Sequence, residues 1–239
     1  MKVSKIVQKI SLFVMVCIFS TVFFTQISRA KDNASLKSSA ADLRQYFLDF
    51  ENVPLGTIPD GWKIEATRQR GPLATWEVIE DDKAPSGQKV LALTRVNHDS
   101  GSTFNLCWTN KVEFLNGEIS VRFKPVTGRI DQGGGIMWRV QDRNNYYVAR
   151  FNPLEDNFRI YFVANGHRMM INSARVRLSS DRYHTMKIVQ HDDTYECYLD
   201  GKRYLHGTDE RFKSKGGVGL WTKADAATRF DDFKVEIEK

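Results

Sequence analysis

The segment from Thr194 to Phe233 carries the strongest structural signal in this sequence. Apolar and polar residues alternate up to Asp200-Gly201, and Lys202 to His206 then forms the returning segment. An Asp-Gly pair between two such segments predicts a β-hairpin, because a type I′ turn requires positive φ at both central residues. In the closing segment, Thr228 to Ile237, the last five residues alternate apolar and charged side chains, as in a strand with one buried face. The domain is therefore expected to end on a β-strand.

Turn signals recur about every ten residues through the rest of the chain, among them Gly71-Pro72, Asn116-Gly117 and Asn165-Gly166. The segments between them are short, and none shows the period of an amphipathic helix. About a dozen short strands of this kind predict an all-β fold, an antiparallel two-sheet jelly-roll sandwich. No internal repeat and no second domain is indicated.

The first 30 residues have the layout of a secretory signal peptide. Three lysines precede an apolar stretch, Ile10 to Phe24, and Ser28-Arg29-Ala30 offers small residues for cleavage before Lys31. The apolar stretch is shorter than the about 20 residues that a membrane span needs, so cleavage is favoured over an uncleaved anchor. We therefore expect the mature protein to be secreted or periplasmic. The predicted organisation is a signal peptide (1–30), a flexible tether (31–45) and one jelly-roll domain (46–239).

Net charge gives little indication of a charged partner. The full chain carries +6, but cleavage would remove four basic residues and no acidic ones and leave +2. Nothing in this balance predicts binding to nucleic acid, or to a membrane beyond the signal segment. Oligomeric state is not predicted.

Two cysteines, Cys107 and Cys197, remain after cleavage, and both lie in predicted strands. In an oxidising compartment they could form one disulfide, but the sequence does not show whether their Cα atoms lie within bonding distance. The alternative is that each thiol is a small buried apolar side chain. Both readings stay open.

Four sequence runs carry a resemblance to a known fold: DGKRY, GGVGLWTKADAATRFDDF, GGGIMWRVQDRNNYYVARFN and YHTMKIV. Together they resemble the laminin-G-like, concanavalin A-like jelly-roll domains of secreted bacterial proteins, over about Phe47 to Ile237. The resemblance implies a concanavalin A-like sandwich. It leaves function open, because this fold carries lectins, glycan hydrolases and adhesion modules.

Two enzymatic relatives of this fold were considered. Laminarinase-like hydrolases carry their carboxylates on one strand, but here Ser120 and Arg122 stand where the second and third acids would be expected. The 3-keto-disaccharide hydrolase-like group is also similar; of its pattern, Arg139 is kept and the downstream glutamate is missing. A glycoside hydrolase or lyase of this second type is the alternative hypothesis. Its acid and base residues would come from outside the known motifs, with Glu118, Asp142 and Glu155 as candidates.

The predicted strands near Gly133-Gly134-Gly135 combine arginines with aromatic rings. Such a combination suits a sugar, since a ring stacks on its apolar face and fixed donors hold its hydroxyls. The alternative is that the aromatics belong to the core and the arginines to a solvated face. The preferred hypothesis is an exported, non-catalytic module that binds carbohydrate, or adheres to a glycan or a cell-surface protein, through its concave sheet. The predicted contacts are Arg139, Tyr147, Arg150, Arg159 and Tyr161.

A zinc site is not predicted, because the five histidines are scattered and no metal-binding spacing occurs. Calcium is a better candidate. The resemblance implies that Ca²⁺ could tie the first and last strands of the fold together, and acidic residues occur at both places. Carboxylate oxygens are ligands that Ca²⁺ prefers. The predicted ligands are Glu51, Asp231 and Asp232, with a structural role; hydrogen-bonded or solvated acids are the alternative.

Overall fold

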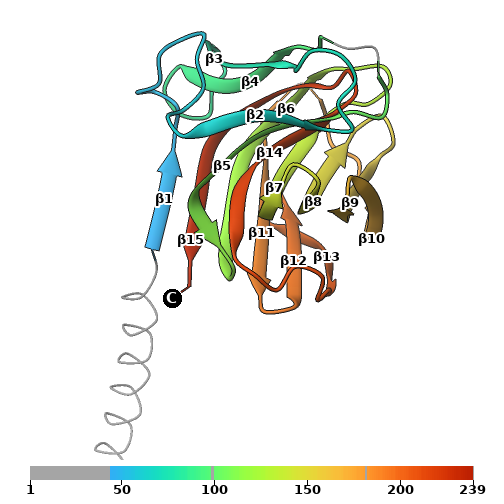
Figure 1. Ribbon diagram of the computed structural model, residues 1–239. Helices are drawn as coiled ribbons and strands as arrows, with labels where there is room; N and C mark the ends of the chain where they lie inside the picture. The colour runs from blue at the N-terminus through green and yellow to red at the C-terminus, as the bar shows by residue number, and fades with distance from the viewer. Residues whose placement is uncertain (1–43, 98–99, 181, 239) are drawn as a thin grey trace, which may run out of the picture. The chain divides into compact units, whose positions relative to one another are not determined.

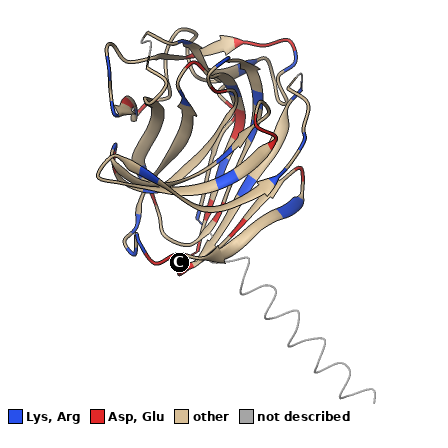
Figure 2. Ribbon diagram, turned by 90° about the vertical axis from the view of Figure 1, so that its right-hand side faces the viewer, with Lys and Arg blue, Asp and Glu red and all other residues tan. Residues whose placement is uncertain are grey.

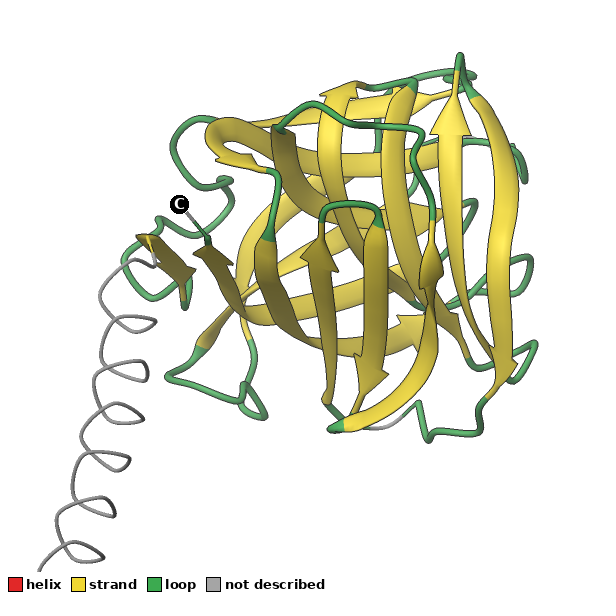
Figure 3. Cartoon of the chain, turned by 90° about the horizontal axis from the view of Figure 1, so that it is seen from below, coloured by secondary structure: helices red, strands yellow, loops and turns green. Residues whose placement is uncertain are grey.

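The computed structural model describes residues 44–97, 100–180 and 182–238 (Figure 1). The predicted signal peptide and nearly all of the predicted tether lie outside these ranges. The described residues form fifteen β-strands, and Figure 3 shows strands and loops but no helix among them. Within this part of the chain, no helix long and apolar enough to cross a membrane was found. The all-β prediction is therefore confirmed.

The strands form two sheets in which neighbouring strands run antiparallel. Sheet A has the order β13-β12-β11-β6-β15-β4-β3, and β1 also pairs with β15. Its last strand is the one that the closing alternation predicted, and the Asp200-Gly201 turn joins β12 to β13. The strands of sheet A are β1 (Arg44–Leu48), β3 (Thr75–Glu80), β4 (Lys89–Arg95), β6 (Gly117–Thr127), β11 (His184–His191), β12 (Thr194–Leu199), β13 (Lys202–Thr208) and β15 (Ala227–Ile237).

Sheet B has the order β10-β9-β8-β7-β14-β5-β2. Its central strands β7, β8 and β14 are buried on both faces along most of their length, unlike the alternating strands of sheet A. The strands of sheet B are β2 (Trp62–Thr67), β5 (Phe104–Phe114), β7 (Gly134–Asp142), β8 (Asn145–Asn152), β9 (Asn157–Ala164), β10 (His167–Arg175) and β14 (Gly216–Lys223).

The main hydrophobic core lies between the two sheets. Ile119, Val121 and Phe123 of β6 reach it from sheet A, and every one of them is at most 1% exposed. Burying such a side chain stabilises the fold by roughly 1.5–3 kcal/mol. Cys107 and Cys197 also lie in this core as free, buried thiols, so the structure contains no disulfide between them.

A second buried cluster fills the face of sheet B that points away from sheet A. It includes Trp108, Met137, Tyr146 and Trp221. This face is closed in because sheet B curls until its two edge strands meet: Arg68, just after β2, donates from Nε to the carbonyl oxygen of Gly166 in the β9–β10 turn, 2.8 Å away. We call the inside of this curl the concave face. Its filling explains why the strands of sheet B show no simple alternation.

Candidate functional site

An open groove of about 430 Å³ runs along the concave side of the β8–β9 hairpin and β10. Strand register places one row of side chains there, because Arg150 of β8 is paired with Arg159 of β9, and Arg159 with Ser173 of β10. Ala149 and Phe151, the neighbours of Arg150 in β8, point into the main core. The groove is lined by Leu154, Glu155, Asp156, Asn157, Arg159, Ser173, Ala174 and Arg175.

Glu155, in the β8–β9 turn, joins the two arginines of this row. Its Oε2 atom lies 3.1 Å from Arg150 Nη2 and 3.0 Å from Arg159 Nη1, and it also accepts a hydrogen bond from Asn157 Nδ2 at 2.8 Å. Arg159 Nε donates to Ser173 Oγ at 3.2 Å. These contacts fix the donors and acceptors along the groove wall.

Asp131 approaches Arg150 from the other side, with its Oδ1 atom 3.9 Å from Nη1. It is 2% exposed and accepts hydrogen bonds from Asn152 Nδ2 at 2.9 Å and Lys223 Nζ at 3.0 Å. The loop that carries it is held by Asp225, whose carboxylate accepts the backbone N–H groups of residues 129–131. We call Asp131, Arg150, Glu155, Arg159 and Tyr161 the Arg150 site.

The charges of the site favour ionised side chains. Partial burial alone would raise the pKa of Glu155, but the hydrogen bond from Asn157 and the charge and hydrogen bond of Arg150 outweigh it, so this pKa is lowered. Burial alone would lower the pKa of Arg150, and the charge of Asp131 reverses that effect. The site therefore presents a carboxylate and guanidinium groups at neutral pH.

Arg168 of β10 folds back over the concave face. The centre of its guanidinium group lies 4.3 Å from the ring centroid of Tyr161, 5.0 Å from that of Phe104 and 5.8 Å from that of Trp221. Arg150 lies 6.0 Å from the same Tyr161 ring. Tyr161 is consequently shared by two cations and only 4% exposed.

Of the five predicted sugar contacts, Arg159 lines the groove, while Arg150 and Tyr161 lie beside it and are 2% and 4% exposed. Tyr147 points the other way, into the main core, where its ring stacks on Trp138 at 5.5 Å. The outward direction expected for Arg139 is also not found, because the β7–β8 register shifts after Trp138 and Arg139 adopts a φ of 47°.

Arg139 instead joins three loops at one end of the sandwich. It donates to the carbonyl oxygens of Leu115 (3.0 Å from Nε), Phe212 (2.8 Å from Nη1) and Asp192 (2.6 Å from Nη2). Burial lowers its pKa. These carbonyls occupy its donors, so the geometry gives Arg139 a structural role.

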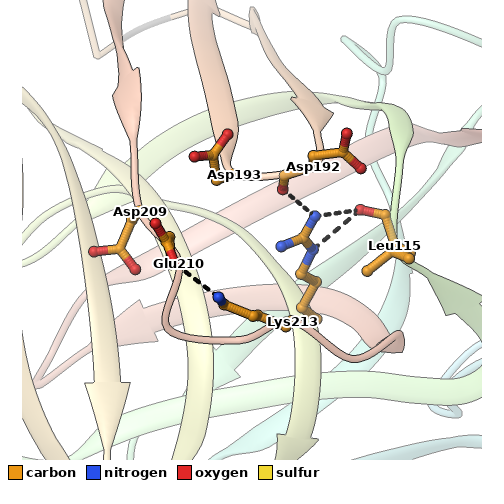
Figure 4. Close-up of a pocket in the computed structure, with 7 residues that line it drawn as sticks. Leu115, Asp192, Asp193, Asp209, Glu210 and Lys213 are labelled. Atoms are coloured by element: carbon orange, nitrogen blue, oxygen red, sulfur yellow. Dashed lines mark hydrogen bonds and ion pairs between the residues drawn. The ribbon is translucent and has the colours of Figure 1, made fainter.

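A second pocket of about 340 Å³ lies beside Arg139 (Figure 4). Its lining contains four carboxylates, of which Glu210 forms an ion pair with Lys213 at 2.6 Å, as the dashed line between them marks. No aromatic ring lines this pocket within the described chain. The described residues that line the groove include no aromatic ring either, so this feature does not separate the two. The carboxylates are those of Asp192, Asp193, Asp209 and Glu210.

The three candidate acids lie far apart in the topology. Glu118 is on β6 in sheet A and forms an ion pair with Lys187 at 3.1 Å. Asp142 caps the β7–β8 turn by accepting the backbone N–H of Asn144 at 2.6 Å. Only Glu155 belongs to the Arg150 site. Figure 2 shows acidic and basic residues interspersed over the strands, in line with the small net charge of the domain.

The three predicted calcium ligands surround the loop that leads into β4. Glu51 accepts the backbone N–H groups of Gln88 at 2.9 Å and Lys89 at 2.7 Å, and Asp231 accepts that of Ser86 at 3.0 Å. The Ser86 hydroxyl donates to Asp232 at 2.8 Å. Among the described residues, no group of three His, Cys, Asp or Glu side chains is arranged to hold a metal ion. The calcium site stays a prediction.

Residues 50–236 match the family model of the 3-keto-alpha-glucoside-1,2-lyase-like domain, which is most of the chain. The chain belongs to this family. No curated protein sequence matches it. The laminin-G-like part of the sequence resemblance stays a prediction.

Similar solved structures include a carbohydrate-binding module and a β-glucanase. Carbohydrate-binding module CBM66 from Bacillus subtilis has a TM-score of 0.56 and 19% identity, covering 73% of this chain and 95% of that one. The β-glucanase of Bacillus licheniformis has a TM-score of 0.55 and 12% identity, covering 82% and 98%. A Bacteroides ovatus mixed-linkage glucan GH16 structure has a TM-score of 0.55 and 11% identity, covering 80% and 99%. These likenesses confirm the jelly-roll fold.

Sequence reasoning missed Asp131, Lys223 and Arg168 as members of this face. Asp131 lies in a loop, where no periodicity indicates direction. The position of Arg168 could have been predicted from the Asn165-Gly166 hairpin signal. This hairpin pairs Arg168 with Val163, whose side chain belongs to the concave-face cluster.

Proposed function

We propose that the protein binds a glycan in the groove of the Arg150 site. The observation that carries this proposal is the set of fixed donors and acceptors along one open groove, provided by Glu155, Asn157, Arg159 and Ser173. Because ion pairs and hydrogen bonds already hold these side chains, ligand binding would lose little side-chain entropy. The volume of about 430 Å³ falls within the usual range of small-ligand sites.

Membership of a family named for action on a glucoside supports a sugar as the ligand. Likeness to structures named as a carbohydrate-binding module and a glucanase supports the same class of ligand, although it does not distinguish binding from catalysis. The acids of the site favour binding. The lowered pKa of Glu155 makes it a weak proton acceptor, and Asp131 is buried against Lys223.

A glycan-array screen of the purified protein, followed by calorimetry on the best ligand, tests this proposal. We expect Arg159→Ala and Glu155→Gln each to weaken binding about tenfold or more, since each removes a charge-assisted contact to ligand hydroxyls. Arg203→Ala is a matched control, because Arg203 forms one ion pair with Glu196 on sheet A. Equal affinity of all three variants and the parent would contradict the proposal. If no glycan binds, a cell-surface protein becomes the better hypothesis for the partner of an exported domain.

The second candidate is a lyase that acts on a 3-keto-glucoside, and the family match favours it. In such an elimination, a base takes the proton on C2, next to the C3 ketone, while the C1–O bond breaks and the departing oxygen takes up a proton. Glu155 is the one candidate acid at the groove. Product analysis by mass spectrometry with a 3-keto-glucoside tests this: an unsaturated sugar product, lost in Glu155→Gln, would establish catalysis. An unchanged substrate would leave the binding function.

A further inference from the structure

Arg150 and the neighbouring Arg168 carry cationic donors that the described chain does not satisfy. The buried Nε and Nη1 atoms of Arg150 and Nη1 of Arg168 have no hydrogen-bond partner among the described residues. Arg150 is 2% exposed, and the nearest acid to its Nη1 is Asp131 at 3.9 Å, beyond hydrogen-bond range. Charged donors that are buried without an acceptor cost free energy, so an acceptor delivered by a ligand would bind well here.

The balance of charge on this face points to the sign of that acceptor. Both carboxylates are already used, Asp131 by Asn152 and Lys223, and Glu155 by Asn157 and two arginines. The charged groups around Arg150 and Arg168 therefore have an excess of positive charge. They are four cations, Arg150, Arg159, Arg168 and Lys223, and two carboxylates, Asp131 and Glu155.

Arg168 and Arg150 share the Tyr161 ring, so Arg168 lies close to these donors. It reaches the Tyr161 ring from β10, an edge strand of sheet B, and the next two residues, Met169 and Met170, are 56% and 57% exposed. Binding at the Tyr161 ring therefore requires the Arg168 side chain to move away from it. A sugar ring could then stack on Tyr161 while an acidic substituent takes the place between the two arginines.

We propose that the ligand of this groove is an acidic glycan, and that a uronic acid carboxylate is the missing partner of Arg150 and Arg168. This inference rests on the proposed glycan binding and adds the substrate class. A carboxylate is planar and matches guanidinium geometry. In a uronic acid it stands in place of the exocyclic hydroxymethyl group of the sugar, and the ring itself is unchanged. Asn157 and Ser173 line the same groove, where they can hydrogen-bond the sugar hydroxyls.

The test is calorimetry of the purified protein with pairs of oligosaccharides of equal length. One member of each pair contains uronic acid, the second is the same sugar after reduction of its carboxyl group, and a sulfated sugar forms a third arm. We expect the uronate to bind about tenfold or more tighter than its reduced form, as for a gained charge-assisted hydrogen bond. Arg168→Gln and Arg150→Lys should remove that preference. Arg177→Gln is the matched control for a nearby charge, because Arg177 has a 72% exposed side chain and pairs with Asp156, which lines the groove.

Thermal unfolding of each variant separates loss of binding from loss of folding, and the partly exposed Arg168 keeps the test valid if the Arg150 variant does not fold. Equal binding of the uronate and its reduced form would overturn the acidic-ligand inference and leave glycan binding intact. Loss of the preference in Arg177→Gln, or equal binding of sulfated sugar in parent and Arg168→Gln, would show general charge attraction and also overturn it. Absence of all glycan binding would contradict the proposed function itself.

Discussion

Replacement of Arg139 by methionine separates a structural role from the ligand contact that the sequence predicted. Methionine keeps most of the volume of the stem and removes the guanidinium group. The carbonyl oxygens of Leu115, Asp192 and Phe212 then lose their charged donor. An unsatisfied buried acceptor costs about 1–3 kcal/mol. Since these three carbonyls border a pocket that water can enter, we expect each to cost about 1 kcal/mol, the lower end of that range. The free energy of unfolding should therefore fall by about 3 kcal/mol.

Urea unfolding, followed by tryptophan fluorescence, measures this loss. With a denaturant slope of about 2 kcal/mol/M, the midpoint should fall by about 1.5 M. Arg203→Met is the control: its side chain is 49% exposed and forms one ion pair, so it should cost less than about 1 kcal/mol. A loss below about 1 kcal/mol in Arg139→Met would refute the structural role. Abolished glycan binding at unchanged stability would restore Arg139 as a ligand contact.

Two further predictions concern titration and thiol reactivity. Burial raises the pKa of Asp231 to about 6, helped by the charge of Asp232, whereas an unfolded aspartate titrates near about 3.9. The contribution of Asp231 to stability is therefore greatest below that lower pKa, and it falls by about 2–3 kcal/mol as the pH rises to about 6. Urea midpoints measured between pH 4 and 8 should show this fall in the parent and not in Asp231→Asn. Parallel curves for the two proteins would count against this assignment. Burial also raises the pKa of the Cys107 and Cys197 thiols, so we expect them to react with an alkylating agent only after unfolding, as detected by peptide mass spectrometry. Thiols that resist alkylation in denaturant without reductant would indicate a disulfide.

Local pattern predicted sheet A well because that sheet buries one face. In β12 the side chains of Tyr195, Cys197 and Leu199 alternate with partly exposed ones, so a period of two residues gave both strand and direction. The Asp200-Gly201 hairpin followed from turn chemistry alone. The side-chain directions in sheet B could not be predicted in this way, because the curl of the sheet buries its second face and removes the polar alternation.

The site depended on two facts that no local pattern contains. The first is the β7–β8 register shift after Trp138, where Arg139 turns toward three loop carbonyls instead of the predicted ligand surface. The second is the meeting of distant segments, since Asp131 and Glu155 reach Arg150 from different loops. The sequence by itself determined the strands, the turns and the all-β class, because these depend on near neighbours. Only the tertiary structure decided which charged groups share a groove, because long-range register and sheet curvature set that grouping.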